Sequence, residues 1–111
     1  MNDEDRKTID EFGACVNLSP AKLENWLKTE ASRSVGFSKS KNAEAVGHAS
    51  GRRIVGLLRK HQADYTDEDI AHMRKTVGYV HRHLAQRPVG DVTATPWRHS
   101  LMNWGHDPSR Q

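Results

Sequence analysis

Several kinds of residue are scarce in this sequence, and each scarcity argues against a class of protein. Among 111 residues only Cys15 is a cysteine, so no intrachain disulfide can form and an oxidised, secreted scaffold is not expected. No apolar run approaches the roughly 20 residues that a transmembrane helix needs. The N-terminal segment Met1–Asp5 is acidic, unlike a signal peptide or a mitochondrial presequence. These features predict a cytoplasmic protein without a membrane span.

Strand signals are also scarce. The sequence has no run of alternating β-branched and aromatic residues, and no Asn-Gly or Asp-Gly pair that would indicate a hairpin. Apolar residues recur instead at helical spacing, as in Ile70, Met73, Val77 and Val80. We therefore predict one all-α domain over residues 1–111, with four to five short helices and ragged ends at about 1–5 and 108–111. The expected helices cover about 5–16, 20–30, 51–61, 67–87 and 96–104.

Hydroxyl side chains mark three of the expected helix starts. Ser19 and Thr95 each precede a proline, a pairing typical of an N-cap followed by the first helical residue. Thr66 precedes three acids, which suit the positive end of the helix dipole. Serine, glycine and asparagine punctuate residues 31–50, so we expect a mobile loop there and a helix that starts after Ser50.

Positive charge is concentrated in the middle of the chain. The net charge is +3, yet residues 31–62 hold seven basic residues against one acid. Residues 1–30 hold seven acids against four bases, and the remainder is balanced. A basic stretch of this kind is typical of a surface that follows a phosphate backbone, although a solvated loop beside an ordinary helix would have the same composition.

The motif Ser50-Gly51-Arg52-Arg53 falls at the expected start of the third helix. Arginines there oppose the helix dipole, but they would complement the free backbone N–H groups in binding a phosphate. Alternatively, both arginines pair with acids of the first helix or with Asp64, Asp67 or Asp69. We predict the following contacts with nucleic acid: Arg33, Lys39, Lys41, Ser50, Gly51, Arg52, Arg53, Arg59 and Lys60.

Motifs for catalysis and for metal binding are missing. There is no Gly-x-Ser-x-Gly elbow, phosphate-binding glycine loop or Cys-x-x-Cys pair. The sequence has seven histidines, but His81 and His83 point to nearly opposite sides of a helix, and His72 and His83 lie three turns apart. We therefore predict no catalytic residue, no metal site and no cofactor, and we expect a protein that is not an enzyme.

The C-terminal segment offers an alternative function. Trp97 and Trp104 share one face of a short helix, and an exposed pair of rings would form a surface for a protein partner, together with Arg98 and His106. The same two rings would equally serve to cover the core. Exposure of the rings distinguishes the two interpretations.

The sequence holds three long motifs, which are Val46–Val55, His72–Pro88 and Thr95–Pro108. Together with Leu18-Ser19-Pro20 and Leu23–Leu27, they resemble one known family. The chain is similar, over about residues 9–108, to the small bacterial and fungal proteins of domain-of-unknown-function family 3140. Members often carry the label "DNA-binding protein", so the resemblance implies DNA as the partner and implies no catalytic activity. With the basic stretch, this leads us to expect low-specificity binding of duplex DNA through phosphates.

Overall fold

Helices account for all the regular structure in the parts of the chain that the computed structural model describes, residues 2–38 and 43–110. Five of the α-helices span at least two turns, and α3 is a single turn, so the all-α prediction is confirmed. A 3-10 turn links α4 to α5. The α-helices are α1 (Asp3–Cys15), α2 (Pro20–Leu27), α3 (Glu30–Arg33), α4 (Val46–Arg59), α5 (Asp67–Leu84) and α6 (Pro96–Asn103), and the 3-10 turn is Gln62–Asp64.

The three helix starts predicted from hydroxyl residues are confirmed. Ser19 accepts a hydrogen bond from the backbone N–H of Lys22, and Thr95 accepts one from Arg98. At α5, the Thr66 hydroxyl accepts from the backbone N–H of Asp69 at 3.1 Å, and the Asp69 carboxylate accepts from the backbone N–H of Thr66 at 3.0 Å. This reciprocal capping box satisfies two N–H groups that would otherwise lack partners.

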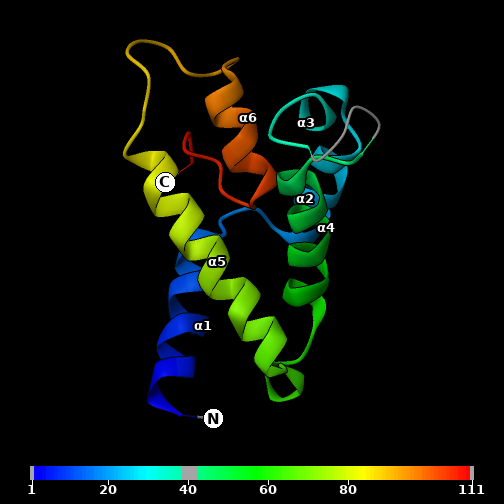
Figure 1. The fold of residues 1–111 in the computed structure, drawn as a ribbon, viewed down its shortest axis with the longest axis vertical. Coiled ribbons are helices and arrows are strands. Elements are labelled where there is room, and N and C mark those ends of the chain that lie inside the picture. Colours follow the sequence, from blue (N-terminus) through cyan, green and yellow to red (C-terminus); the bar gives the residue numbers. More distant parts are fainter. Residues whose placement is uncertain (1, 39–42, 111) are drawn as a thin grey trace.

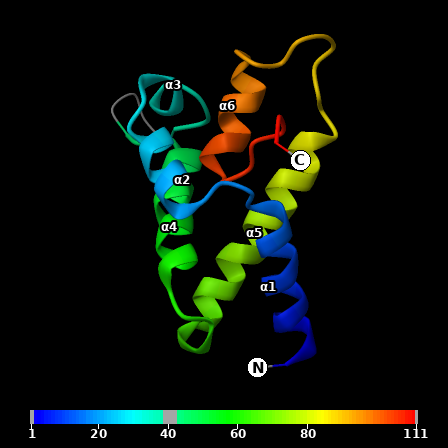
Figure 2. The ribbon, with the colours of Figure 1, turned by 180° about the vertical axis from the view of Figure 1, so that it is seen from behind.

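Two pairs of helices form the body of the fold. α1 lies along α5 and α2 lies along α4, while α6 packs against α2, α3, α4 and α5 (Figures 1 and 2). The core forms where four of these helices meet, and Leu23, Ile54, Met73 and Leu101 are completely inaccessible to solvent there. No helix within residues 2–38 and 43–110 is long and apolar enough to cross a membrane.

The predicted loop over residues 31–50 is wrong at both of its ends. Its first residues belong to α3, and α4 begins at Val46 rather than after Ser50. The glycines that indicated a loop are instead points of close helix contact. A Cβ on Gly51 would lie 2.4 Å from the backbone oxygen of Asn103, and one on Gly47 would lie 2.9 Å from Nε1 of Trp104. Glycine suits both positions because a side chain would press against the α6 backbone at Gly51 and against the Trp104 indole at Gly47.

A buried asparagine ties α6 to the N-terminal half of the chain. Asn103 is 1% exposed, and its Oδ1 accepts hydrogen bonds from Trp26 Nε1 at 2.7 Å and from the Ser32 hydroxyl at 2.5 Å. Its Nδ2 donates to the backbone oxygen of Ser32 at 2.9 Å. Since α2, α3 and α6 each contribute one of these residues, the asparagine fixes how three helices meet.

The C-terminal tryptophans are part of the interior. Trp97 and Trp104 are only 8% and 4% exposed. The prediction of an exposed pair of rings, on which the protein-partner alternative depended, is therefore wrong. Both stack with rings of α5, in the order His72, Trp104, Tyr79, His83, Trp97. Successive centroids lie 6.1, 4.4, 5.1 and 6.1 Å apart, and no two successive planes differ by more than 17°. The stacked rings hold α6 and the residue after it against α5.

Candidate nucleic-acid interface

The predicted phosphate site at a helix start is not formed. Because α4 begins at Val46, Arg52 and Arg53 lie in its second and third turns, away from the free N–H groups of its first turn. Ser50 and Gly51 are buried in the same helix. Ser50 Oγ lies 2.9 Å from Nε2 of His72, and Gly51 faces the backbone of α6. This part of the prediction is therefore corrected.

Two of the predicted contacts form close ion pairs within the protein. Arg59 Nη1 lies 3.0 Å from a carboxylate oxygen of Glu24, and Lys60 Nζ lies 2.5 Å from Oδ2 of Asp69. The hydrogen bond from Lys60, together with the cap at Thr66, lowers the pKa of Asp69 to about 2. Both carboxylates would repel a phosphate placed beside these cations.

Arg52 is paired in a similar way. It binds both carboxylate oxygens of Glu44, and its Nε lies 2.8 Å from Oε2. These hydrogen bonds are the main cause that lowers the pKa of Glu44 to about 2. Arg52 is therefore paired within the protein, but with Glu44, which was not among the acids that the alternative interpretation named.

The four other predicted contacts differ in their surroundings. Arg53 forms an ion pair with Asp69 at 3.6 Å, as the alternative interpretation expected, and its side chain is half exposed. Arg33 is exposed at the end of α3 and forms no ion pair with any residue that the structure describes. Lys39 and Lys41 lie outside the described residues.

The sequence analysis missed two exposed cations on α5. Lys75 and Arg82 form no ion pair with any of the described residues. They share a helix face with His72 and Tyr79, at positions i, i+3, i+7 and i+10. Helical spacing opposite the buried stripe was the signal that could have revealed them. The two cations were overlooked because acids and bases balance over residues 63–111 as a whole. Half of those acids lie in residues 67–69, at the start of α5, and so leave the rest of the helix basic.

These side chains line a continuous depression between α4 and α5. One part has a volume of about 300 Å³, and the adjoining part has a volume of about 570 Å³. The two parts share Val46 and Lys75. We call this depression the α4–α5 groove, and define it by Phe37, Val46, Ser50, Arg53, His72, Lys75, Tyr79, Arg82 and Trp104.

Basic side chains outnumber acids in the lining of the groove, where Arg53, Lys75 and Arg82 lie with one acid, Glu44, which is paired with Arg52. Burial lowers the pKa of His72 below its ordinary value, and the nearby charges of Arg53 and Lys75 lower it further. At neutral pH this histidine is therefore uncharged and can serve as a hydrogen-bond partner beside two cations. An anion in the groove would meet Arg53 on one side and Lys75 on the other.

Two partly buried pairs of side chains are close enough for chemistry but lack the further groups that catalysis or metal binding needs. His72 meets Ser50, but no described carboxylate binds the other ring nitrogen to orient it as a base. Cys15 Sγ lies 3.6 Å from His81 Nε2, and burial, followed by the charge of Glu11, raises the pKa of this thiol. Within the described ranges, no three His, Cys, Asp or Glu side chains are grouped as metal ligands.

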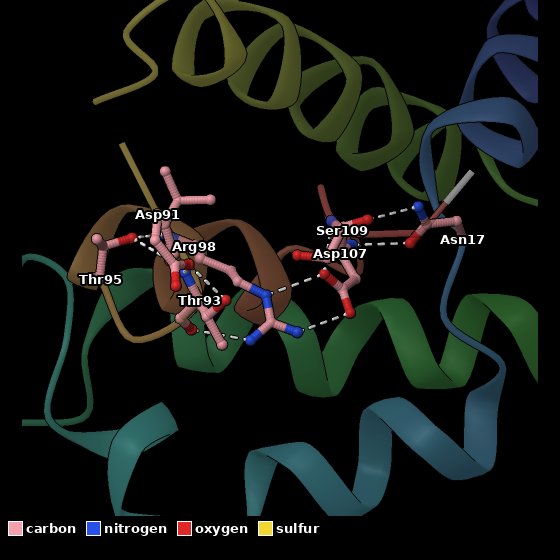
Figure 3. A network of polar contacts seen from close by, with 8 residues as sticks. Asn17, Asp91, Thr93, Thr95, Arg98, Asp107 and Ser109 are labelled. Carbon is pink, nitrogen blue, oxygen red and sulfur yellow. Dashed lines mark hydrogen bonds and ion pairs between the residues drawn. The ribbon is translucent and has the colours of Figure 1, made fainter. Parts of the chain in front are cut away.

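Arg98 and His106, proposed contacts for a protein partner, instead hold the C-terminus in place. Figure 3 shows the Arg98 guanidinium facing the carboxylate of Asp107, with Nε–Oδ1 and Nη2–Oδ2 distances of 3.1 and 3.0 Å. Asn17 binds the backbone N–H and oxygen of Asp107 at 2.7 and 2.9 Å. His106 Nδ1 lies 2.7 Å from the backbone oxygen of Cys15. These contacts close the chain over the link between α1 and α2.

The fold and groove thus define a small all-α protein with a cationic depression beside its longest helix. A comparison with known families matches residues 11–102 to the family described as "Protein of unknown function (DUF3140)". The chain belongs to this family, as its three long motifs predicted. No curated protein and no solved structure matches the chain.

Proposed function

We propose that this protein is a non-enzymatic DNA-binding protein that contacts phosphates through the α4–α5 groove. The observation that supports this most is the exposure of Lys75 and Arg82 on one face of α5, without an acid partner among the described residues. Arg53, which is paired with Asp69 at 3.6 Å, stands across the groove from Lys75. A row of cations that is not neutralised within the protein is what a phosphate backbone requires.

The proposed contact set differs from the one predicted from sequence alone. Arg52, Arg59 and Lys60 face carboxylates, so contact with a phosphate would first require those pairs to separate. A phosphate could contact Lys75 and Arg82 without separating an ion pair of the described residues. Because the groove cations are directed at phosphates rather than base edges, we expect little sequence specificity. A cytoplasmic location is part of the proposal, since a lone thiol suits a reducing compartment.

The test is fluorescence anisotropy with a labelled DNA strand and with its duplex, each titrated over a series of salt concentrations. Binding through phosphates predicts that log K falls linearly with log salt, with a slope of about −0.9 per contact for duplex DNA. An unrelated sequence should bind with similar affinity. Absence of binding at low salt would refute the proposal.

A matched pair of double variants locates the contacts. Lys75→Gln with Arg82→Gln removes two groove cations and should reduce the salt slope on duplex DNA by about 2. Arg59→Gln with Lys60→Gln removes the same charge from two paired positions and should reduce the slope less. If the second variant lost more affinity than the first, DNA would bind along the α4 C-terminus and not in the groove.

A further inference from the structure

One part of the α4–α5 groove has features that phosphate contacts do not explain. Its volume of about 300 Å³ lies at the lower end of the range for small-molecule pockets, roughly 300–1,000 Å³. Phe37, Tyr79 and Trp104 contribute aromatic walls, while Lys75 and Arg82 line the same space. Phe37 is 73% exposed, so its ring is available to a ligand. The pocket thus combines ring surfaces with positive charge.

The pocket also presents a free hydrogen-bond donor. The indole N–H groups of Trp26 and Trp97 each donate to an acceptor at 2.7 Å, but that of Trp104 has no acceptor among the described residues. In that part of the chain, the only fully buried side-chain polar atom without a partner is Nε2 of His83. The Trp104 N–H is therefore not fully enclosed, and it opens onto the pocket that Trp104 lines.

A glycine keeps the space in front of this donor open. Gly47 lines the same pocket, and a Cβ at this position would lie 2.9 Å from Nε1 of Trp104. Any side chain on Gly47 would occupy the place of an acceptor. A donor without a protein acceptor but with an open approach is ready to bind a ligand, because a ligand acceptor would complete its hydrogen bond.

We propose that this pocket receives one unpaired nucleobase of a bound DNA strand. This inference rests on the proposed function. An acceptor on the edge of the base would bind the Trp104 N–H, and the ring of Phe37 would stack on its face. The adjoining phosphates would meet Lys75 and Arg82. Since bases in a duplex are already paired and stacked, the pocket favours single-stranded DNA or an extruded base.

The three indole N–H signals of the ¹⁵N-labelled protein provide the test. A thymidine oligonucleotide is compared with a fully abasic strand of equal length, which carries the same phosphates without bases. The Trp104 signal, assigned by its loss in Trp104→Phe, should shift with the thymidine strand and not with the abasic strand. The Trp26 and Trp97 signals are internal controls, because their N–H groups already have protein acceptors.

Affinity measurements provide a second readout that does not disturb the core. Phe37→Ala should lower affinity for the thymidine strand about tenfold and leave affinity for the abasic strand unchanged. Val89→Ala is the matched control, since Val89 is another exposed apolar side chain and does not line the pocket. The pocket is supported if the difference in affinity between the thymidine strand and the abasic strand is lost in Phe37→Ala and kept in Val89→Ala.

The possible results separate this inference from the proposed function. If both strands bind equally, with the same salt dependence and an unmoved Trp104 signal, the base pocket is refuted and phosphate binding stands. If neither strand nor duplex binds at low salt, the proposed function fails. A Trp104 shift with free thymidine monophosphate, in the absence of any strand binding, would assign the pocket to a free nucleotide and overturn the inference for DNA.

Discussion

The contact between α4 and α6 predicts opposite effects for alanine at two glycines of one helix. A Cβ on Gly51 would lie 2.4 Å from the backbone oxygen of Asn103 and 2.7 Å from Cδ2 of Leu27. Ordinary contact begins at 3.4 Å, so α6 would have to move by about 1 Å. That movement would disturb the hydrogen bonds of Asn103, because the clashing atom belongs to its own backbone.

The expected net effect of Gly51→Ala is a loss of about 2 kcal/mol in the free energy of unfolding. Overpacking against a backbone atom costs about 3 kcal/mol, at the upper end of the usual range. The greater helix propensity of alanine offsets about 1 kcal/mol of this cost. For a domain of this size, such a loss lowers the Tm by on the order of 10 °C.

Gly56→Ala is the control within the same helix. Gly56 is exposed, and no atom lies within 4 Å of a Cβ placed there, so alanine should raise the free energy of unfolding by about 1 kcal/mol. Urea denaturation followed by far-UV circular dichroism measures all three proteins. If Gly51→Ala were as stable as Gly56→Ala, α4 and α6 would not be in the close contact described above.

Three further predictions concern buried polar groups. Asn103→Leu should destabilise the fold by about 3 kcal/mol in urea denaturation, because it leaves the donors of α2 and α3 unsatisfied; a loss below about 1 kcal/mol would contradict this. Arg98→Ala leaves the carboxylate of Asp107 buried without its cation and should cost about 3 kcal/mol, with the Arg98→Ala, Asp107→Asn double variant recovering part of it. Burial lowers the pKa values of His72 and His83 below 6.5, so the unfolded state binds more protons and the urea midpoint should fall as pH drops below 6.5; an unchanged midpoint would refute this.

The starts of α2, α5 and α6 were predicted correctly because their caps are local, although the equally local caps of α1 at Asn2 and of α3 at Thr29 were missed. Thr66 and Asp69 satisfy each other across three positions, so the start of α5 depends on no other part of the chain. The same holds for Ser19 and Thr95. Local geometry alone decides these hydrogen bonds, and for this reason the sequence predicted them correctly.

The start of α4 could not be predicted because its cause lies elsewhere in the chain. Gly47 and Gly51 have the local signature of a loop, and they are helical because α6 packs against them. Ala45, at the N-cap, provides no side-chain hydrogen bond that would have revealed the start. A residue pattern cannot distinguish a glycine that frees the backbone from a glycine that admits a neighbouring helix.

The candidate site, too, has features that the sequence determines and features that only the tertiary structure determines. The sequence by itself determined the all-α class, the capped helix starts and the family, because propensities, caps and long motifs are properties of short segments. Only the tertiary structure decided which cations are neutralised, since Arg59 meets an acid 35 positions away and Arg52 meets one 8 positions away. The tertiary structure likewise buries Trp97 and Trp104, and it leaves Lys75 and Arg82 without acid partners among the described residues. Charge pairing depends on distance in space, and the packing of α4 and α5 sets that distance.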